Sequence, residues 1–269
     1  MSLVDTHCHI QSIGQSVHDH TSELWAKMGY SAEEIISRAK ENGVNKLICV
    51  GCDLEDSTIA VEFAHSRQNC YSSLGIHPHE AARYLNETEV KDTFRSLAAK
   101  PKVVALGECG LDYFYGHSSP KDQKRLLNWQ LELASELDLP VIFHVRDAFR
   151  DFWPIFDRYQ GKIRGVLHSF TDDSGNLKLA LERGLYLGVN GIATFTKEKK
   201  QQDMFKAIPL ERLLLETDAP YLTPTPYRGT INEPKQIRRI AEFVSGQRGI
   251  SLDDLAETTT RNAHLLFRL

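Results

Sequence analysis

The feature of this sequence that most restricts its fold is a repeated alternation of short apolar runs with longer amphipathic stretches. Eight runs have the length and composition of strands, namely residues 3–9, 46–51, 71–77, 102–108, 140–144, 164–169, 185–189 and 212–217. Helix-like stretches separate them, among them 31–43, 119–138 and 233–246. This alternation is typical of parallel βαβ units with right-handed crossovers. Eight units favour the α/β class and a (β/α)8 TIM barrel over an open doubly wound sheet.

The sequence contains no nucleotide-binding motif and no obvious linker. No G-x-G-x-x-G follows the first apolar run, and no G-x-x-x-x-G-K-[ST] occurs anywhere. The chain has 269 residues, a length that α/β barrels commonly reach as one unit. We therefore expect a single domain over residues 1–269.

Two local segments carry specific expectations. The stretch 31–43 begins with a Ser cap at Ser31, has Glu34 at the capping-box position and ends in Gly43, so it is predicted to be a helix. Residues 11–30 are expected to form a long first loop. Within it, His18, Asp19 and His20 are interpreted as part of a polar loop rather than as a metal site.

Composition and charge exclude some classes of protein. The formal net charge of −4 argues against a broad basic surface for nucleic acid, so an anionic substrate must be held by local charges. No apolar run approaches the roughly 18 residues that span a bilayer, and no signal-peptide pattern opens the chain. The five cysteines suit reduced thiols in the cytoplasm, and Cys49 and Cys52 are expected to be buried thiols despite their C-x-x-C spacing.

Good metal-ligand side chains recur where the predicted strands end. These residues are His7, His9, Glu108, His144, His168 and Asp218. In a parallel barrel all carboxyl ends of the strands converge on one face, where active sites are built. A single such residue has an ordinary structural explanation, such as a hydrogen-bonded core histidine. Six of them at strand ends predict a shared site.

The cost of burying charge favours a metal centre at that site. An unpaired buried carboxylate costs several kcal/mol, and a divalent cation removes this cost. Imidazoles favour zinc or manganese, whereas carboxylates also accept magnesium. Six ligands exceed the roughly four of one tetrahedral zinc, so we expect two divalent ions bridged by Glu108. His7, His9 and Asp218 are assigned to one ion, and His144 and His168 to the other.

Motifs along nearly the whole chain make the family recognisable. They are DTHCH (5–9), GIHPH (75–79), GECGLDYF (107–114), HVRDA (144–148), HSFT (168–171), ETDAPYLTP (216–224), RGTINEP (228–234) and TTRNAHLLF (259–267). The chain resembles the TatD-type metal-dependent deoxyribonucleases, within the amidohydrolase-like barrel hydrolases. The resemblance implies that the same six residues hold the metals and that the substrate is DNA. Departures from the family pattern lie at Gln11, Asp172 and Ile231 and in the longer segment 11–30.

The expected reaction is hydrolysis of phosphodiester bonds by a metal-activated water. Metal ions lower the pKa of bound water to roughly 7, and Asp218 is the candidate general base, with Glu108 as the second catalytic carboxylate. Candidate substrate contacts are His77, His79, Arg146, Tyr113 and Arg228. Arg146 suits a phosphate, and the rings of Tyr113, Phe114 and Tyr115 offer faces on which unpaired bases can stack, although Phe114 is expected to pack internally. The few basic groups and the stacking rings favour exonuclease-like action on single-stranded or frayed ends, and with the family resemblance we expect a 3'-5' direction.

Two other classes of function are considered. The same metals would serve a hydrolase acting on an amide, lactone or ester, including an aminoacyl ester on tRNA, since the fold alone does not separate these reactions. A non-enzymatic metal-binding protein is disfavoured, because structural zinc sites are usually closed by four Cys or His ligands.

Overall fold

The computed structural model describes residues 2–15, 20–84 and 88–269. Within these residues, eight strands form one parallel sheet in the order in which they follow along the chain. They are β1 Leu3–Cys8, β2 Val44–Val50, β3 Cys70–Leu74, β4 Val103–Asp112, β5 Val141–Arg146, β6 Gly165–Leu167, β7 Tyr186–Val189 and β8 Leu213–Leu215. The segment after β8 lies beside β1 through a parallel bridge between Cys8 and Ala219. The predicted α/β barrel is confirmed.

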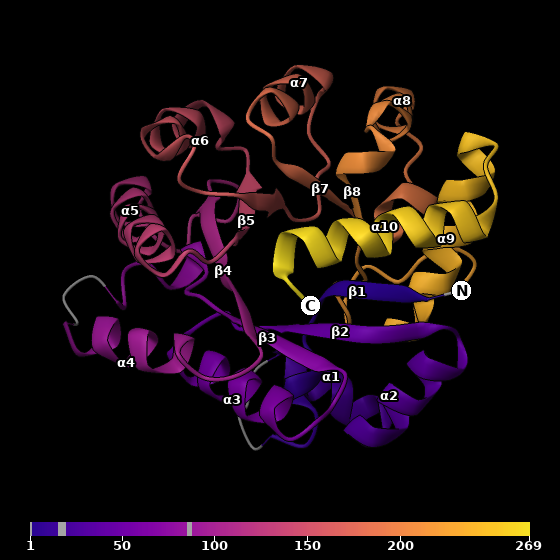
Figure 1. The fold of residues 1–269 in the computed structure, drawn as a ribbon, viewed down its shortest axis with the longest axis horizontal. Coiled ribbons are helices and arrows are strands. Elements are labelled where there is room, and N and C mark those ends of the chain that lie inside the picture. Colours follow the sequence, from indigo (N-terminus) through magenta and orange to yellow (C-terminus); the bar gives the residue numbers. More distant parts are fainter. Residues whose placement is uncertain (1, 16–19, 85–87) are drawn as a thin grey trace.

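Helices surround this sheet, as Figure 1 shows. They are α1 His20–Met28, α2 Ala32–Glu41, α3 Leu54–His65, α4 Thr88–Ala98, α5 Pro120–Leu137, α6 Phe149–Phe156, α7 Ser174–Glu182, α8 Lys199–Ala207, α9 Ile237–Arg248 and α10 Leu252–Phe267. The predicted cap of α2 is confirmed: Ser31 Oγ accepts a hydrogen bond from the Glu34 N–H, and the Glu34 carboxylate accepts one from the Ser31 N–H. No helix in the described part of the chain is long and apolar enough to cross a bilayer.

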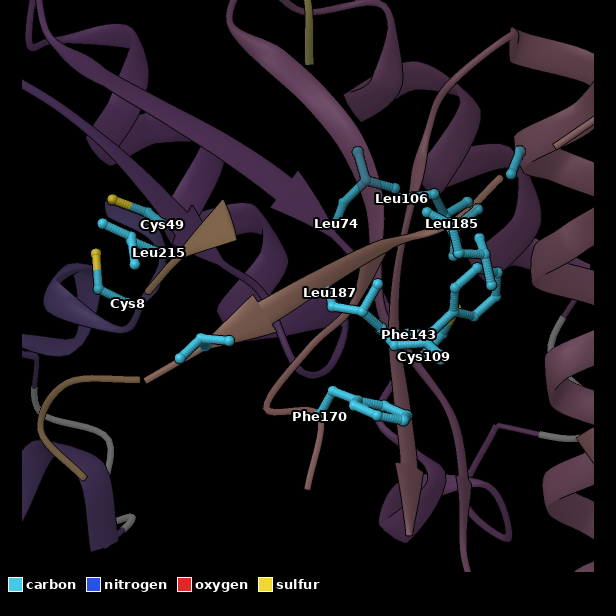
Figure 2. Close-up of a cluster of buried hydrophobic side chains, with 14 of the residues drawn as sticks. Cys8, Cys49, Leu74, Leu106, Cys109, Phe143, Phe170, Leu185, Leu187 and Leu215 are labelled. Carbon is cyan, nitrogen blue, oxygen red and sulfur yellow. The ribbon is translucent and has the colours of Figure 1, made fainter. Parts of the chain in front are cut away.

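Two buried layers follow from the alternation of side chains along the strands. One lies between the strands and the helices, and Figure 2 shows Cys49, Leu106 and Phe143 within it. The other contains Val4, Ile48, Val50, Val104, Ala105, Ile142, Val166 and Leu214 from the strands, and Ala263, Leu266 and Phe267 from α10. This second layer fills the inside of the barrel and is covered at one end by α10. The opposite end is therefore left for polar side chains.

The prediction of a loop over residues 11–30 is wrong in its second half, because α1 covers His20–Met28. Trp25 explains this helix, since its indole is buried and its Nε1–H donates to the His9 carbonyl oxygen at 2.9 Å. The helix thereby gains apolar burial that a polar loop does not offer. His18 and Asp19 lie outside the described residues, and His20 begins α1.

Candidate metal centre

Four of the predicted ligands meet closely at the open end of the barrel. His7 Nε2 lies 3.3 Å from Glu108 Oε2 and 3.7 Å from Asp218 Oδ1. His9 Nε2 lies 3.4 Å from the same Asp218 oxygen. His7 is on β1, Glu108 is on β4, and His9 and Asp218 lie just beyond β1 and β8. The carboxyl ends of strands that are far apart in sequence therefore meet, as predicted.

His144 and His168 complete the group around Glu108. His144 Nδ1 lies 2.8 Å from Glu108 Oε1, and His168 Nε2 lies 3.7 Å from the same oxygen. The other ring nitrogen of His144 lies 2.9 Å from Asp112 Oδ2. Both nitrogens of His144 thus contact carboxylates. The structure brings all six sequence-predicted residues together.

The donors fit divalent metal ions. Nitrogen and oxygen donors on one tetrahedral zinc lie about 3.3 Å apart, given bond lengths of about 2.0–2.1 Å. The separations of His7 from Glu108 and of His9 from Asp218 match that value. His7 has no exposed surface, yet neither of its ring nitrogens has a hydrogen-bond partner among the described residues. Its Nε2 contacts the Glu108 and Asp218 carboxylates without forming a hydrogen bond, and a cation shared by these groups would satisfy that nitrogen.

The donors fall into groups that differ in part from the expected division between two ions. His7, His9 and Asp218 form one candidate group, as predicted. His168 is grouped with His7 and Glu108, whereas His144 is grouped with Glu108 and His77. Glu108 belongs to both of these groups, which suits the bridging position that the sequence predicts for it.

Close backbone packing makes this convergence possible. A Cβ at Gly110 would lie 1.8 Å from the carbonyl oxygen of His144, so only glycine allows β4 and β5 to approach so closely there. Behind β1, the buried carboxyl group of Asp5 accepts hydrogen bonds from the N–H groups of Thr217 and His7. Asp5 therefore ties the segment after β8 to the strand that carries His7.

Electrostatics keep the central carboxylates ionised. Burial alone would raise the pKa of Glu108, but the imidazoles of His168, His7 and His144 lower it well below its ordinary value. Asp218 behaves similarly: burial opposes ionisation, yet contact with His9 lowers its pKa. Burial also lowers the pKa of His168, but Glu216 and Glu108 outweigh it and raise the pKa to about 10. The site therefore presents anionic oxygens to a cation at neutral pH.

A cavity of about 640 Å³ opens over these donors. Of the predicted substrate residues, His77 and His79 line it. The residues that line it and that matter for the chemistry are His9, Cys52, His77, His79, Glu108, Asp112, Tyr115, His117, His144, His168, Asp218 and Tyr221. The cavity is lined mainly by polar and ring side chains, which suits a charged substrate with flat groups.

Three other predicted substrate residues lie outside the described lining of this cavity. The Tyr113 ring packs against the core, and its hydroxyl lies 3.0 Å from Asp151 Oδ2. Arg228 donates to the Thr223 carbonyl and stacks on Phe195. The prediction that these two side chains face the substrate is not supported by their placement, since each is held by its own neighbours.

Arg146 lies at the rim, beside Phe114 and Tyr115, two of the three rings that the sequence offers for stacking. Its guanidinium stacks over Phe114 at 3.9 Å and over Tyr115 at 4.9 Å. Phe114 is 56% exposed, so the prediction that it packs internally is wrong. Asp112 explains this arrangement, because its Oδ1 accepts the N–H groups of Phe114 and Tyr115 and turns the chain outward. Tyr115, rather than Tyr113, presents its ring to the cavity.

Sequence reasoning missed three residues that shape the centre. Asp112 contacts His144, and Glu216 contacts His168. Cys52, which was expected to be a buried core thiol, is only half-buried and lines the cavity, whereas Cys49 is buried as predicted. The two carboxylates could have been found from the alternation of side chains along a strand. Asp112 is four positions after Glu108, and Glu216 is two positions before Asp218, so each pair is expected on the same side.

A barrel of this kind, with imidazoles and carboxylates gathered where its strands end, defines the class of barrel-type metal-dependent hydrolases. Comparison with known proteins narrows this class. The TatD related DNase family matches residues 4–268. The chain belongs to this family, as the sequence motifs implied.

Individual relatives match this chain over nearly its full length. The chain is 36% identical over 269 residues to the Bacillus subtilis protein named uncharacterized metal-dependent hydrolase YabD, covering 99% of each chain. It is 36% identical over 253 residues to the 3'-5' ssDNA/RNA exonuclease TatD of Shigella flexneri, covering 92% of this chain and 95% of the relative. The crystal structure of the TatD homolog YjjV from Escherichia coli superposes with a TM-score of 0.87 at 28% identity, covering 99% and 98% of the two chains.

Proposed function

We propose that this protein, acting as one domain over residues 1–269, hydrolyses phosphodiester bonds of DNA as a 3'-5' exonuclease on single-stranded or frayed ends. The observation that carries the proposal is the fully buried His7, whose ring nitrogens have no described hydrogen-bond partner, beside Glu108 and Asp218 at an open polar cavity. Such a centre lies where a substrate can reach it. Relatives that are 36% and 38% identical to this chain are named 3'-5' ssDNA/RNA exonucleases.

The centre is proposed to hold two divalent ions, with zinc favoured by the imidazoles and magnesium or manganese as alternatives. His7, His9 and Asp218, which form one candidate group, would hold one ion. His144 and His168 would serve the other, with Glu108, which both contact, contributing to both ions. When bound, such ions supply Lewis acidity at the phosphoryl oxygen and make the attacking water more acidic. The polar cavity at the strand ends is consistent with this chemistry.

The side chains of this chain have separate tasks in the reaction. The Asp218 carboxylate, half-buried beside His9, accepts the proton of the attacking water. His77, whose Nε2 lies 3.9 Å from Glu108 Oε1, and His79, whose Nε2 lies 3.1 Å from Asp112 Oδ2, line the cavity and would donate to phosphate oxygens. At the rim, Arg146 and the exposed rings of Phe114 and Tyr115 offer a charge and stacking surfaces for unpaired nucleotides. The rim therefore suits a single strand better than a rigid duplex.

Location in the cytoplasm is part of the same proposal. All five cysteines are unpaired, and four of them are buried. Free thiols persist in a reducing compartment, where disulfides are rare.

The test is an assay of metal-depleted protein restored in turn with zinc, manganese and magnesium. A single-stranded oligonucleotide labelled at its 5' end should give a ladder that shortens from the 3' end, and a duplex should be cut more slowly. Glu108→Gln should abolish cleavage, whereas Glu257→Gln, at an exposed position on α10, should not. Turnover of neutral esters without cleavage of DNA under any metal would overturn the proposal in favour of a carbonyl hydrolase.

A further inference from the structure

Cys52 lies just beyond the end of β2, as His9 and Asp218 lie just beyond the ends of β1 and β8. Ile48, Val50 and Cys52 alternate onto the same side, and the first two pack inside the barrel. On β5, the interior residue Ile142 is followed two positions later by His144 in the same way. Of the five cysteines, Cys52 alone lines the described cavity over the metal centre.

The thiol faces the central carboxylate. Cys52 Sγ lies 3.7 Å from Glu108 Oε2, the oxygen that His7 Nε2 approaches to 3.3 Å. A ring nitrogen of His9, the sulfur and a Glu108 oxygen all lie within 4.8 Å of one another. Sulfur and oxygen donors on one tetrahedral zinc lie about 3.5 Å apart, given bonds of about 2.3 and 2.0 Å. The separation of Cys52 from Glu108 therefore fits two donors on one ion.

An independent observation indicates a cation at this point. His7 is fully buried beside the same Glu108 oxygen, and its ring nitrogens have no hydrogen-bond partner in the described structure. The position of Cys52 is itself fixed, since its backbone N–H donates to Asp56 Oδ2 at 2.9 Å. Asp56 also accepts from Gln11, one of the residues that depart from the family pattern. These hydrogen bonds hold the backbone of Cys52 beside the centre, and the sulfur itself contacts Glu108.

We propose that Cys52 is a metal ligand, sharing an ion with His9 and Glu108, and that its sulfur makes this centre selective for soft or borderline ions over magnesium. The inference rests on the proposed function, because it adds a donor to the same centre. On binding, the S–H proton passes to the buffer and a sulfur–metal bond forms, with no change of oxidation state. Thiolate sulfur prefers zinc, cadmium or cobalt, whereas magnesium prefers oxygen donors.

Cobalt(II) provides the test, because sulfur ligation gives a charge-transfer band in the near ultraviolet, separate from the visible bands of the metal. Metal-depleted protein titrated with cobalt should show both. Cys52→Ser should lose the near-ultraviolet band and keep the visible ones, whereas Cys70→Ala, which removes a buried thiol on β3, should keep both. Chelator competition should show that Cys52→Ser binds cadmium at least about 10-fold more weakly than the wild type. Loss of a residue that only supports a ligand already costs about 10–100-fold in metal affinity.

The outcomes separate this inference from the proposed function. Visible cobalt bands without the near-ultraviolet band in the wild-type protein, or a band that survives in Cys52→Ser, would overturn the assignment of Cys52. DNA cleavage by such a protein would leave the exonuclease proposal standing. The near-ultraviolet band in a protein that cleaves no DNA with any ion would support the ligand and overturn the function. Failure to bind cobalt at all would overturn both.

Discussion

Nδ1 of His168 lies 3.0 Å from Oε1 of Glu216, and both side chains are buried. The same Glu216 oxygen accepts a hydrogen bond from the Ser169 N–H at 2.6 Å. A Cβ at Gly188 would lie 2.2 Å from the other Glu216 oxygen, so glycine leaves the space that this carboxylate needs. Glu216 therefore fixes the orientation of His168, with Nε2 directed at Glu108.

Replacing Glu216 with Gln should weaken metal binding while the fold is retained. A carboxylate behind a histidine ligand orients the ring and raises its basicity, and its loss typically costs about 10–100-fold in metal affinity. Zinc affinity measured by chelator competition should fall by that factor. Glu211→Gln, exposed near the start of β8, is the matched control. Equal zinc affinities for the two variants would contradict the role of Glu216.

Metal uptake should release protons, and metal affinity should fall as the pH falls. Burial lowers the pKa of His9, but contact with Asp218 outweighs it and raises the value to about 9. The pKa of His168 is raised to about 10 by Glu216 and Glu108, so both rings are protonated in the metal-free protein at neutral pH. An ion can bind only after these protons leave. Calorimetric titration with zinc in buffers of different ionisation enthalpy should detect the release at pH 7, and uptake without it would be contrary to this expectation.

Substituting Arg146 with Ala should impair phosphodiester cleavage selectively. A hydrogen bond to a charged group contributes about 1.5–3 kcal/mol, which corresponds to a loss of about 10- to 100-fold in kcat/KM on DNA. Hydrolysis of a small neutral ester should change far less. Arg150→Ala, at an exposed position on α6, serves as the control. Equal losses on the two substrates would favour carbonyl chemistry.

Asp5 should make the protein less stable as the pH rises. Burial raises the pKa of this carboxyl group to about 8, despite opposing hydrogen bonds from Thr217 and the His7 N–H. Between the ordinary value of 3.8 and about 8, the folded protein keeps a proton that the unfolded chain has lost. The free energy of unfolding therefore falls by about 1.4 kcal/mol per pH unit from this group alone, and the effect levels off above pH 8.

Asp5→Asn removes this titratable group, so comparing the variant with the wild type isolates its contribution. The difference in unfolding free energy between the variant and the wild type should shift in favour of the variant as the pH rises from about 5 to 8. Urea unfolding of metal-depleted protein measures it, and Asp92→Asn, exposed on α4, should show no such trend. A pH-independent difference for Asp5→Asn would mean that its carboxyl group is ionised in the folded protein.

The barrel and the six central donors could be predicted because each depends on local patterns. Strand runs and helix caps repeat along the chain, and residues such as Glu108 and His168 follow apolar runs directly. Parallel topology then brings strand ends together whatever the details of packing. The helix α1 was missed because its stability comes from Trp25, whose contact with His9 joins residues that periodicity does not connect.

The substrate rim was harder to predict for a physical reason. Beyond the last strand residue the chain turns, and the hydrogen bonds of one side chain decide where the next residues point. Asp112 turns Phe114 and Tyr115 outward, while Asp151 holds the Tyr113 hydroxyl. These choices depend on tertiary contacts that no spacing rule contains. The strand parity that relates Asp112 to Glu108 was available in the sequence.

The contact between Trp25 and the His9 carbonyl gives the protein an optical reporter of its own. The indole is one of three in the chain, and it is hydrogen-bonded to the main chain of a residue that faces the centre. Any shift of His9 on ion uptake alters the surroundings of that indole. Tryptophan fluorescence should therefore report metal binding at the centre without an added label, and Trp25→Phe should abolish the fluorescence change.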